Sequence, residues 1–217
     1  YARQLATTAV ALGFICGLAA SGAAQRLPLP TVRFVYLVPS DRQPRPQYVD
    51  AIERAAHDLQ QWLAGQMAGR TARLAFPIVR TVQTDHPEAY YRGDGASGSG
   101  YWYRGVNDGL ALVGGEYGDK DDIWVFYLDA QSGCGQTSGA AAASVVLVSD
   151  DDLKGLGDGT PYARCGSYFP FPQLRWVGGL GHELGHALGL PHPPGCDQGD
   201  YSICDASALM WLGYTTY

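Results

Sequence analysis

The segment His182–His192, which reads HELGHALGLPH, constrains this chain more than any other stretch of its sequence. His182 and His186 are four residues apart, so on a helix their side chains project from the same face, one turn apart. Both imidazoles can then reach one ion at the distance of about 2.0–2.1 Å that zinc requires. His192 follows as a third nitrogen ligand. Three protein ligands leave a fourth position for water or substrate, which is typical of a catalytic zinc site rather than a structural one.

Two further residues of this segment complete the prediction. Glu183 follows the first ligand, so its carboxylate lies beside the metal and can take a proton from a water molecule there. Gly189 has no Cβ and can adopt the left-handed conformation that ends the helix and turns the chain towards His192. The alternative interpretation, histidines buried in a protein core, would have to account for three of the chain's five histidines and a glutamate within 11 residues. We therefore favour the metal site.

The pattern HExxHxxGxxH resembles the signature of the metzincin clan of zinc endopeptidases. Such enzymes also carry a methionine turn beneath the metal, and Met210, 18 residues after the third histidine, matches it. The resemblance implies an α+β fold with a twisted, mostly parallel sheet, an antiparallel edge strand, a backing helix and an active-site helix. It also implies an upper subdomain, about residues 31–189, and a small irregular lower subdomain, about residues 190–217. For the edge strand, which binds substrate as an added strand, we expect residues 140–148.

The resemblance leaves the family within the clan unassigned. Pro193 follows the third histidine, as in serralysins, whereas Leu212 stands where those enzymes have a tyrosine. Tyr214 is the nearby phenol. The resemblance also implies a substrate pocket past the third histidine, and we expect Leu212 and Tyr214 in its wall.

Apolar patterning predicts alternating strands and a helix in the first part of the chain. From Pro46 to Met67, apolar residues recur at steps of three and four, which predicts a helix with one buried stripe. Apolar runs rich in strand-forming residues predict strands at 32–38, 75–82, 123–128 and 144–148. The first two of these strands and the helix between them predict a βαβ unit.

The first 24 residues have the features of a secretory signal: Arg3, an apolar run from Leu5 to Ala20, and small residues before Gln25. A membrane anchor is the alternative interpretation, but a run of about 16 residues is short for a membrane span. We therefore expect a signal peptide at 1–24 and a catalytic domain at 25–217. The mature protein is expected to be secreted, extracellular or periplasmic, without a stable membrane span.

Removal of the signal peptide leaves four cysteines, an even number that suggests two disulfides in an exported chain. Three pairings can be drawn. We favour Cys134–Cys165 and Cys196–Cys204, because the second pair closes a short loop that begins after two prolines. A zinc–thiolate site is the alternative, but the chain has no CxxC pair.

The charged residues argue against nucleic acid as a partner and make calcium a second candidate ion. The formal net charge is −6 and Lys and Arg do not cluster, so we expect no nucleic-acid-binding surface. Calcium is a second candidate ion, because acidic residues gather at Asp119, Asp121, Asp122 and Asp150–Asp152. Without the spacing of a known calcium loop, solvated turns are the favoured interpretation of these acids.

These observations predict a secreted, monomeric zinc endopeptidase that acts on a peptide or protein. One Zn²⁺ is bound by His182, His186 and His192, and Glu183 is the general base. Two alternatives stay open: a secreted zinc-containing binding module without catalysis, and a zinc hydrolase of another amide or ester, such as a cell-wall peptide. Glu183 argues against the first alternative, because a structural zinc site needs no base.

Overall fold

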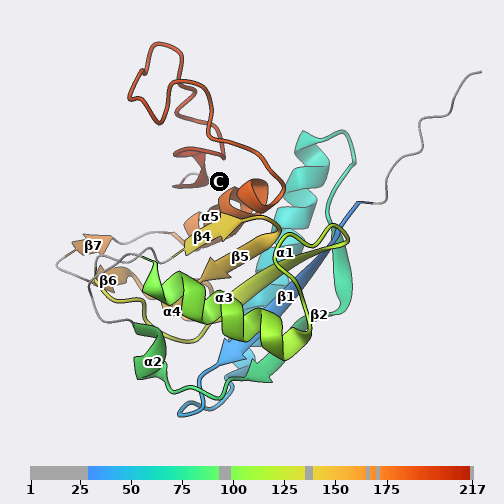
Figure 1. Cartoon of the computed structure of the whole chain (residues 1–217). Coiled ribbons are helices and arrows are strands. Elements are labelled where there is room, and N and C mark those ends of the chain that lie inside the picture. Colours follow the sequence, from blue (N-terminus) through green and yellow to red (C-terminus); the bar gives the residue numbers. More distant parts are fainter. Residues whose placement is uncertain (1–28, 93–98, 135–138, 165–166, 170–171, 216–217) are drawn as a thin grey trace, which may run out of the picture.

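A computed structural model describes most of the chain (Figure 1). The described residues are 29–92, 99–134, 139–164, 167–169 and 172–215. The expected signal peptide at 1–24 lies outside them.

Five strands form one sheet, which runs through the middle of the molecule (Figure 1). Its strands are β1 (Thr31–Val38), β2 (Arg73–Gln83), β3 (Asp122–Leu128), β4 (Gly139–Ala142) and β5 (Val145–Val148). Their order is β2-β1-β3-β5-β4, and every neighbouring pair is parallel except β4 with β5. This confirms the expected mostly parallel sheet with an antiparallel edge strand.

The expectation of one edge strand at 140–148 is wrong in its extent. The segment is a hairpin, in which β4 lies at the edge and β5 lies between β4 and β3. Ala143 and Ser144 form the turn, with positive φ angles of 44° and 70°. β5 reads VVLV and is buried throughout, whereas β4 reads GAAA and is only partly buried. The apolar run of β5 is buried on both faces, which suits a strand inside the sheet, whereas the small residues of β4 suit its edge.

Helices cover both faces of the sheet. They are α1 (Pro46–Gln66), α2 (Glu88–Arg92), α3 (Gly100–Val113), α4 (Asp150–Gly157) and α5 (Gln173–Ala187). Successive side chains of a strand point to opposite faces, so β1 contributes to two cores. Phe34 and Tyr36 pack in a core with α1, α4 and α5, whereas Val35 and Leu37 pack in a second core with α3. Figure 1 shows the resulting three layers, with α3 on one side of the sheet and α1 on the other.

The helix α1 confirms the predicted buried stripe. It begins at Pro46, where the missing N–H of proline costs no helical hydrogen bond. Tyr48, Ile52, Ala55 and Leu59 recur at steps of three and four and are buried. Because β1 and β2 are parallel neighbours on either side of this helix in sequence, the three elements form the expected βαβ unit.

The acidic run Asp150–Asp152 is not a solvated turn, contrary to expectation. It forms the first turn of α4, and all three side chains are buried. Ser149 caps the helix by accepting a hydrogen bond from the Asp151 N–H, and Asp150 forms an ion pair with Lys154 at 2.7 Å. Carboxylates suit a helix N-terminus because of the partial positive charge there. The packing of α4 between α1 and α5, which the sequence pattern does not reveal, buries them.

The chain after α5 is irregular, as the expected small C-terminal part of the fold requires. It forms turns as far as a short 3-10 helix, η1 (Gly213–Thr215), and lies next to α5 (red in Figure 1). The expected Cys196–Cys204 disulfide is present. The other expected pair includes Cys165, which lies outside the described residues. Ahead of α5, β6 (Tyr162–Arg164) and β7 (Ser167–Phe169) form a separate two-stranded sheet.

Within the described ranges, no helix has the length and apolar character that crossing a lipid bilayer would demand.

Candidate active site

The helix α5 carries the first two histidines and lies in close contact with its neighbours because it is rich in glycine. A Cβ added to Gly181 would lie 2.9 Å from Leu59 of α1. One added to Gly185 would lie 2.3 Å from the sulfur of Met210. Glycine at these positions therefore lets α1 and the Met210 turn approach the helix directly, which fixes the position of the helix that carries the two histidines.

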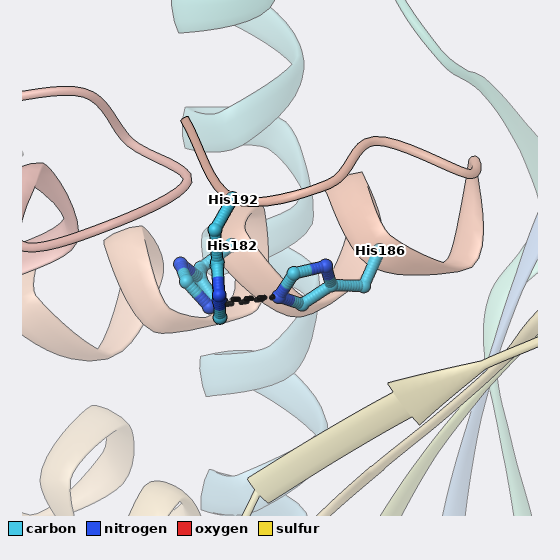
Figure 2. Close-up of side chains that lie close together, drawn as sticks. All are labelled: His182, His186 and His192. Atoms are coloured by element: carbon cyan, nitrogen blue, oxygen red, sulfur yellow. Dashed lines mark hydrogen bonds between the residues drawn. The ribbon is translucent and has the colours of Figure 1, made fainter. Parts of the chain in front are cut away.

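The third histidine reaches the site because the chain reverses immediately after α5. Gly189 has a φ of +85°, a left-handed conformation in which glycine has no steric penalty. The Leu190 N–H then donates to the Gly185 carbonyl at 2.9 Å, which closes the helix end. The chain returns alongside the helix and brings His192 beside His186 (Figure 2).

The three imidazoles converge on one point. The Nε2 atom of His186 lies 3.1 Å from Nε2 of His182 and 3.1 Å from Nε2 of His192, and Figure 2 shows these contacts as dashed lines. Each Nδ1 atom faces a protein acceptor, namely the Leu209 carbonyl at 2.9 Å for His182, the Leu190 carbonyl at 2.9 Å for His186, and the Asp197 carboxylate at 2.7 Å for His192.

This hydrogen bonding fits a bound metal ion. Because a carbonyl or a carboxylate can only accept, each Nδ1 carries the proton and each Nε2 presents a lone pair to the shared point. Three lone pairs this close repel one another unless a cation lies between them. Nitrogen ligands at about 2.0–2.1 Å in a tetrahedral zinc site lie about 3.3 Å apart, close to the separation found here. Burial also lowers the pKa of His182, which favours the neutral imidazole that a metal needs.

The acidic residues considered for calcium do not form such a site. Among the described residues, the histidine triad is the only group of three or more metal-ligating side chains with ligand atoms within 4.8 Å of one another. Asp119 instead accepts hydrogen bonds from the backbone N–H groups of Asp121 and Asp122, and Asp122 forms an ion pair with Arg33.

Glu183 lies beside the triad and lines a cavity of about 180 Å³ together with His182. The pKa of its carboxyl is raised to about 7, chiefly by burial and also by the nearby Asp152 carboxyl, while Arg175 acts in the opposite direction. A carboxyl with a pKa near neutrality suits a group that must both accept and release a proton at physiological pH. The arrangement can therefore bind a metal ion and exchange a proton with a water molecule next to it.

Comparisons with known proteins bear on the fold that carries this site. No protein-family model matches the chain, and no curated protein sequence matches it. Wild-type OgpA from Akkermansia muciniphila, in its P 41 21 2 crystal form, matches with a TM-score of 0.50 and 20% identity over 90% of this chain and 58% of its own. Catalytically inactive OgpA in complex with an O-glycopeptide (glycodrosocin) substrate matches with a TM-score of 0.50 and 18% identity over 89% and 58%.

The chain shares the fold of OgpA. It spans about 58% of the length of the OgpA chain. At this level of identity the likeness establishes the shared α+β fold and does not extend to the chemistry of the site.

Two of the other predicted site residues lie next to the triad in this OgpA-like fold, and one does not. Met210 packs beneath α5 against Gly185. The ring of Tyr214 lies 5.2 Å from the ring of His182, and Tyr214 lines the cavity beside Glu183. Leu212 is exposed and does not line this cavity, so its expected place in a substrate pocket stays a prediction.

Three further residues lie at this site, and the sequence pattern did not place any of them there. Asp197 orients His192, and its position five residues after that histidine, within the disulfide loop, is the feature that could have indicated it. Asp152 and Arg175 line the cavity with Glu183. Arg175 is seven residues before His182, two helical turns along the same face of α5, so helical periodicity could have indicated it.

Proposed function

We propose that this protein is a zinc-dependent endopeptidase of the metzincin clan, in which Glu183 is the general base. The observation that carries the proposal is the convergence of three Nε2 lone pairs beside a half-buried carboxylate that lines the same cavity as the first histidine. A zinc site with three protein ligands and an adjacent general base is typical of hydrolysis rather than of structural support.

The residues of the chain would divide the reaction as follows. His182, His186 and His192 hold the ion, which supplies Lewis acidity for the water and for the scissile carbonyl when it is bound. Glu183 takes a proton from the attacking water and delivers it to the leaving nitrogen. The carboxyl therefore returns to its starting state at the end of each cycle.

The edge strand β4 offers the substrate a route past this site. A Cβ added to Gly139 would lie 3.7 Å from Oε1 of Glu183, so β4 begins directly beside the catalytic carboxylate. Among the strands of the described residues, β4 pairs with β5 alone, which leaves its other edge for an extended peptide. A peptide added as a further strand would pass the triad with its backbone fixed by hydrogen bonds.

The variant Glu183→Gln tests the assignment. It keeps the size of the side chain and removes the base, so we expect zinc content equal to that of the wild type and a loss of hydrolysis by at least about 10²-fold. The variant His192→Ala should lose zinc and activity together. Zinc is measured by elemental analysis, and hydrolysis by mass spectrometry of peptide products. Undiminished hydrolysis in the glutamine variant would contradict the proposal.

The choice of substrates separates this proposal from its alternatives. The panel contains casein, matched peptides with and without an O-linked sugar, and cell-wall material, each with and without phenanthroline. OgpA, which has the same fold, binds an O-glycopeptide substrate in one of its crystal structures. The assay therefore compares peptides with and without the sugar. Cleavage of cell-wall material alone would support the other zinc hydrolase, and binding without cleavage would support the non-catalytic module.

We also propose that the mature chain, residues 25–217, is one catalytic domain with an upper and a lower part, and that it works outside the cytoplasm. The Cys196–Cys204 disulfide supports this location, because such bonds persist in oxidising compartments. Fractionation of the producing cells, followed by sequencing of the mature N-terminus, tests the location and the expected cleavage after residue 24.

A further inference from the structure

The cavity beside Glu183 has a mostly polar lining. Its wall includes Asp152 from α4, Arg175 from α5 and Tyr214 from η1. The other lining residues are Gly139, Val148, Gly179, His182 and Glu183. The inference below rests on the proposed peptidase function, because it concerns which side chain of a substrate this cavity would take.

Packing holds the guanidinium of Arg175 in place. It lies 4.6 Å from the centre of the Trp176 ring and 5.0 Å from the centre of the Tyr214 ring, so it is in contact range for two cation–π interactions. A Cβ added to Gly179 would lie 2.7 Å from the Arg175 Nη1 atom. Glycine at position 179 therefore leaves the space along α5 that the guanidinium occupies.

Asp152 supplies the opposite charge. It is 7% exposed and yet lines the cavity, so its carboxyl faces the small volume left open there. The pKa of this carboxyl is raised to about 7, chiefly by burial, and the nearby positive charge of Arg175 limits the rise. The cavity thus presents a fixed donor and a fixed acceptor to whatever enters it.

This lining discriminates between classes of side chain. An apolar side chain would separate Asp152 and Arg175 from water without offering a hydrogen bond, which is costly for buried polar groups. Asp152 and Arg175 carry opposite charges, so a charged side chain of either sign would pair with one of them and lie against a like charge on the other. A neutral group that both donates and accepts hydrogen bonds meets neither penalty.

We propose that this cavity is a specificity pocket for a neutral hydrogen-bonding group on a residue that flanks the scissile bond, which donates to Asp152 and accepts from Arg175. An amide, a hydroxyl and the hydroxyls of an attached sugar share this chemistry. Because the cavity adjoins Glu183, which acts at the scissile bond, the group belongs to one of the two flanking residues.

A peptide library on the zinc-loaded enzyme tests the pocket. The two residues that flank the cleaved bond are varied separately through Gln, Asn, Ser, Thr, Leu, Phe, Lys and Glu, with additional O-glycosylated Ser and Thr. At one of the two positions we expect kcat/KM for the neutral polar group to exceed that for Leu, Lys and Glu by at least about tenfold. The amide, hydroxyl and glycosylated peptides identify which source of this chemistry fits. A preference for Leu or Phe, or for a charged residue, would overturn the inference.

Two variants examine the role of Arg175 itself. Arg175→Met removes the guanidinium and retains the stem, and Gly179→Ala displaces the guanidinium with a single methyl group. Both should reduce the ratio of kcat/KM between the best neutral polar peptide and the Leu peptide by at least about fivefold. Leu174→Ala, an exposed change on the same helix, is the matched control and should leave the ratio unaltered.

The outcomes distinguish this inference from the proposed function. An unaltered ratio in both variants, with hydrolysis intact, overturns the specificity pocket alone. Absence of hydrolysis of every peptide by the zinc-loaded wild type overturns the peptidase function and the pocket with it.

Discussion

At the scale of single residues, the direction of each imidazole depends on an acceptor that binds no metal itself. Two of these acceptors are backbone carbonyls, and the third is the Asp197 side chain, 2.7 Å from Nδ1 of His192. Groups of this kind fix the tautomer and the ring orientation of a ligand and increase its basicity. A carboxylate on a turn is the easiest of the three to remove by substitution.

The variant Asp197→Ala should therefore weaken zinc binding by about tenfold while the protein stays folded. Asp200→Asn is the control, because it removes one negative charge from the same loop and retains an oxygen for the turn bond to Ser202. Competition with a fluorescent chelator measures the affinity. If both substitutions weakened zinc binding equally, the loss of negative charge, and not the orientation of His192, would account for the effect.

A second prediction at this scale concerns Asp152 and the dependence of stability on pH. Its pKa rises from the ordinary 3.8 to about 7 in the folded protein because it is buried. Between these values the folded state holds a proton that the unfolded state has released, so the free energy of unfolding falls as pH rises from about 4 to 7. Asp152→Asn removes this dependence, and we expect the variant to be more stable than the wild type by about 2–4 kcal/mol at pH 8 and equally stable near pH 4.

Urea unfolding of the metal-free proteins at both pH values measures this difference. Asp50→Asn, on the exposed surface of α1, gives the effect of losing one surface charge. If Asp152→Asn raised the free energy of unfolding by the same amount at pH 4 and pH 8, the proposed coupling between stability and protonation of Asp152 would be wrong.

At the scale of elements, close approach of helices to the sheet depends on glycines that face it. In α3, a Cβ on Gly105 would lie 2.8 Å from Leu147, and a Cβ on Gly109 would lie 2.8 Å from Phe126. These residues are one helical turn apart, so they form a small-residue face on the sheet side of the helix. Glycine weakens an isolated helix, and here packing against β3 and β5 compensates for that weakness.

Replacement of glycine by alanine should therefore change the free energy of unfolding in opposite directions at two helical positions. Gly109→Ala should lower the free energy of unfolding by about 1–3 kcal/mol, because the methyl group overpacks the contact with Phe126. Gly65→Ala, at an exposed site of α1 with no atom within 4 Å of the added Cβ, should raise it by up to about 1 kcal/mol. Chemical denaturation measures both, and stabilisation by the Gly109 change would refute the close-packing argument.

At the scale of the whole molecule, one buried carboxylate links the ends of elements that are distant in sequence. Asp129, just after β3, is fully buried and accepts hydrogen bonds from Tyr36 of β1 at 2.6 Å, from Arg42 at 2.5 Å and from Arg45 at 2.5 Å. Arg45 is the residue that precedes α1. The cluster therefore joins β3 to β1 and to the start of the helix that carries the main core.

Removal of this carboxylate should destabilise the entire fold. Asp129→Ala leaves two guanidinium groups without their buried partner, and we expect a loss of about 3–5 kcal/mol in the free energy of unfolding. Asp122→Asn, which breaks the more exposed ion pair with Arg33, should cost no more than about 1 kcal/mol. Thermal and urea unfolding measure both, and similar losses in the two variants would contradict the role given to Asp129.

The metal site and much of the sheet were predictable because their signals are local. An interval of four residues on a helix places His182 and His186 on one face wherever that helix lies. Runs such as VRFVYLV and the three-and-four spacing of α1 depend likewise on neighbours in the chain. The helix α3 escaped prediction because Gly105 and Gly109 are poor helix formers, and only contact with Leu147 and Phe126 explains them.

The sequence by itself determined the shared helix face of His182 and His186, the helix end at Gly189 and the alternation of strands with α1, since each of these follows from spacing or from the conformational range of one residue. Only the tertiary structure decided that Asp197 supports His192, that 139–148 is a hairpin, and that Asp152 and Arg175 share the cavity of Glu183. These pairings join side chains or strands whose relation is set by packing, and packing depends on the whole chain at once.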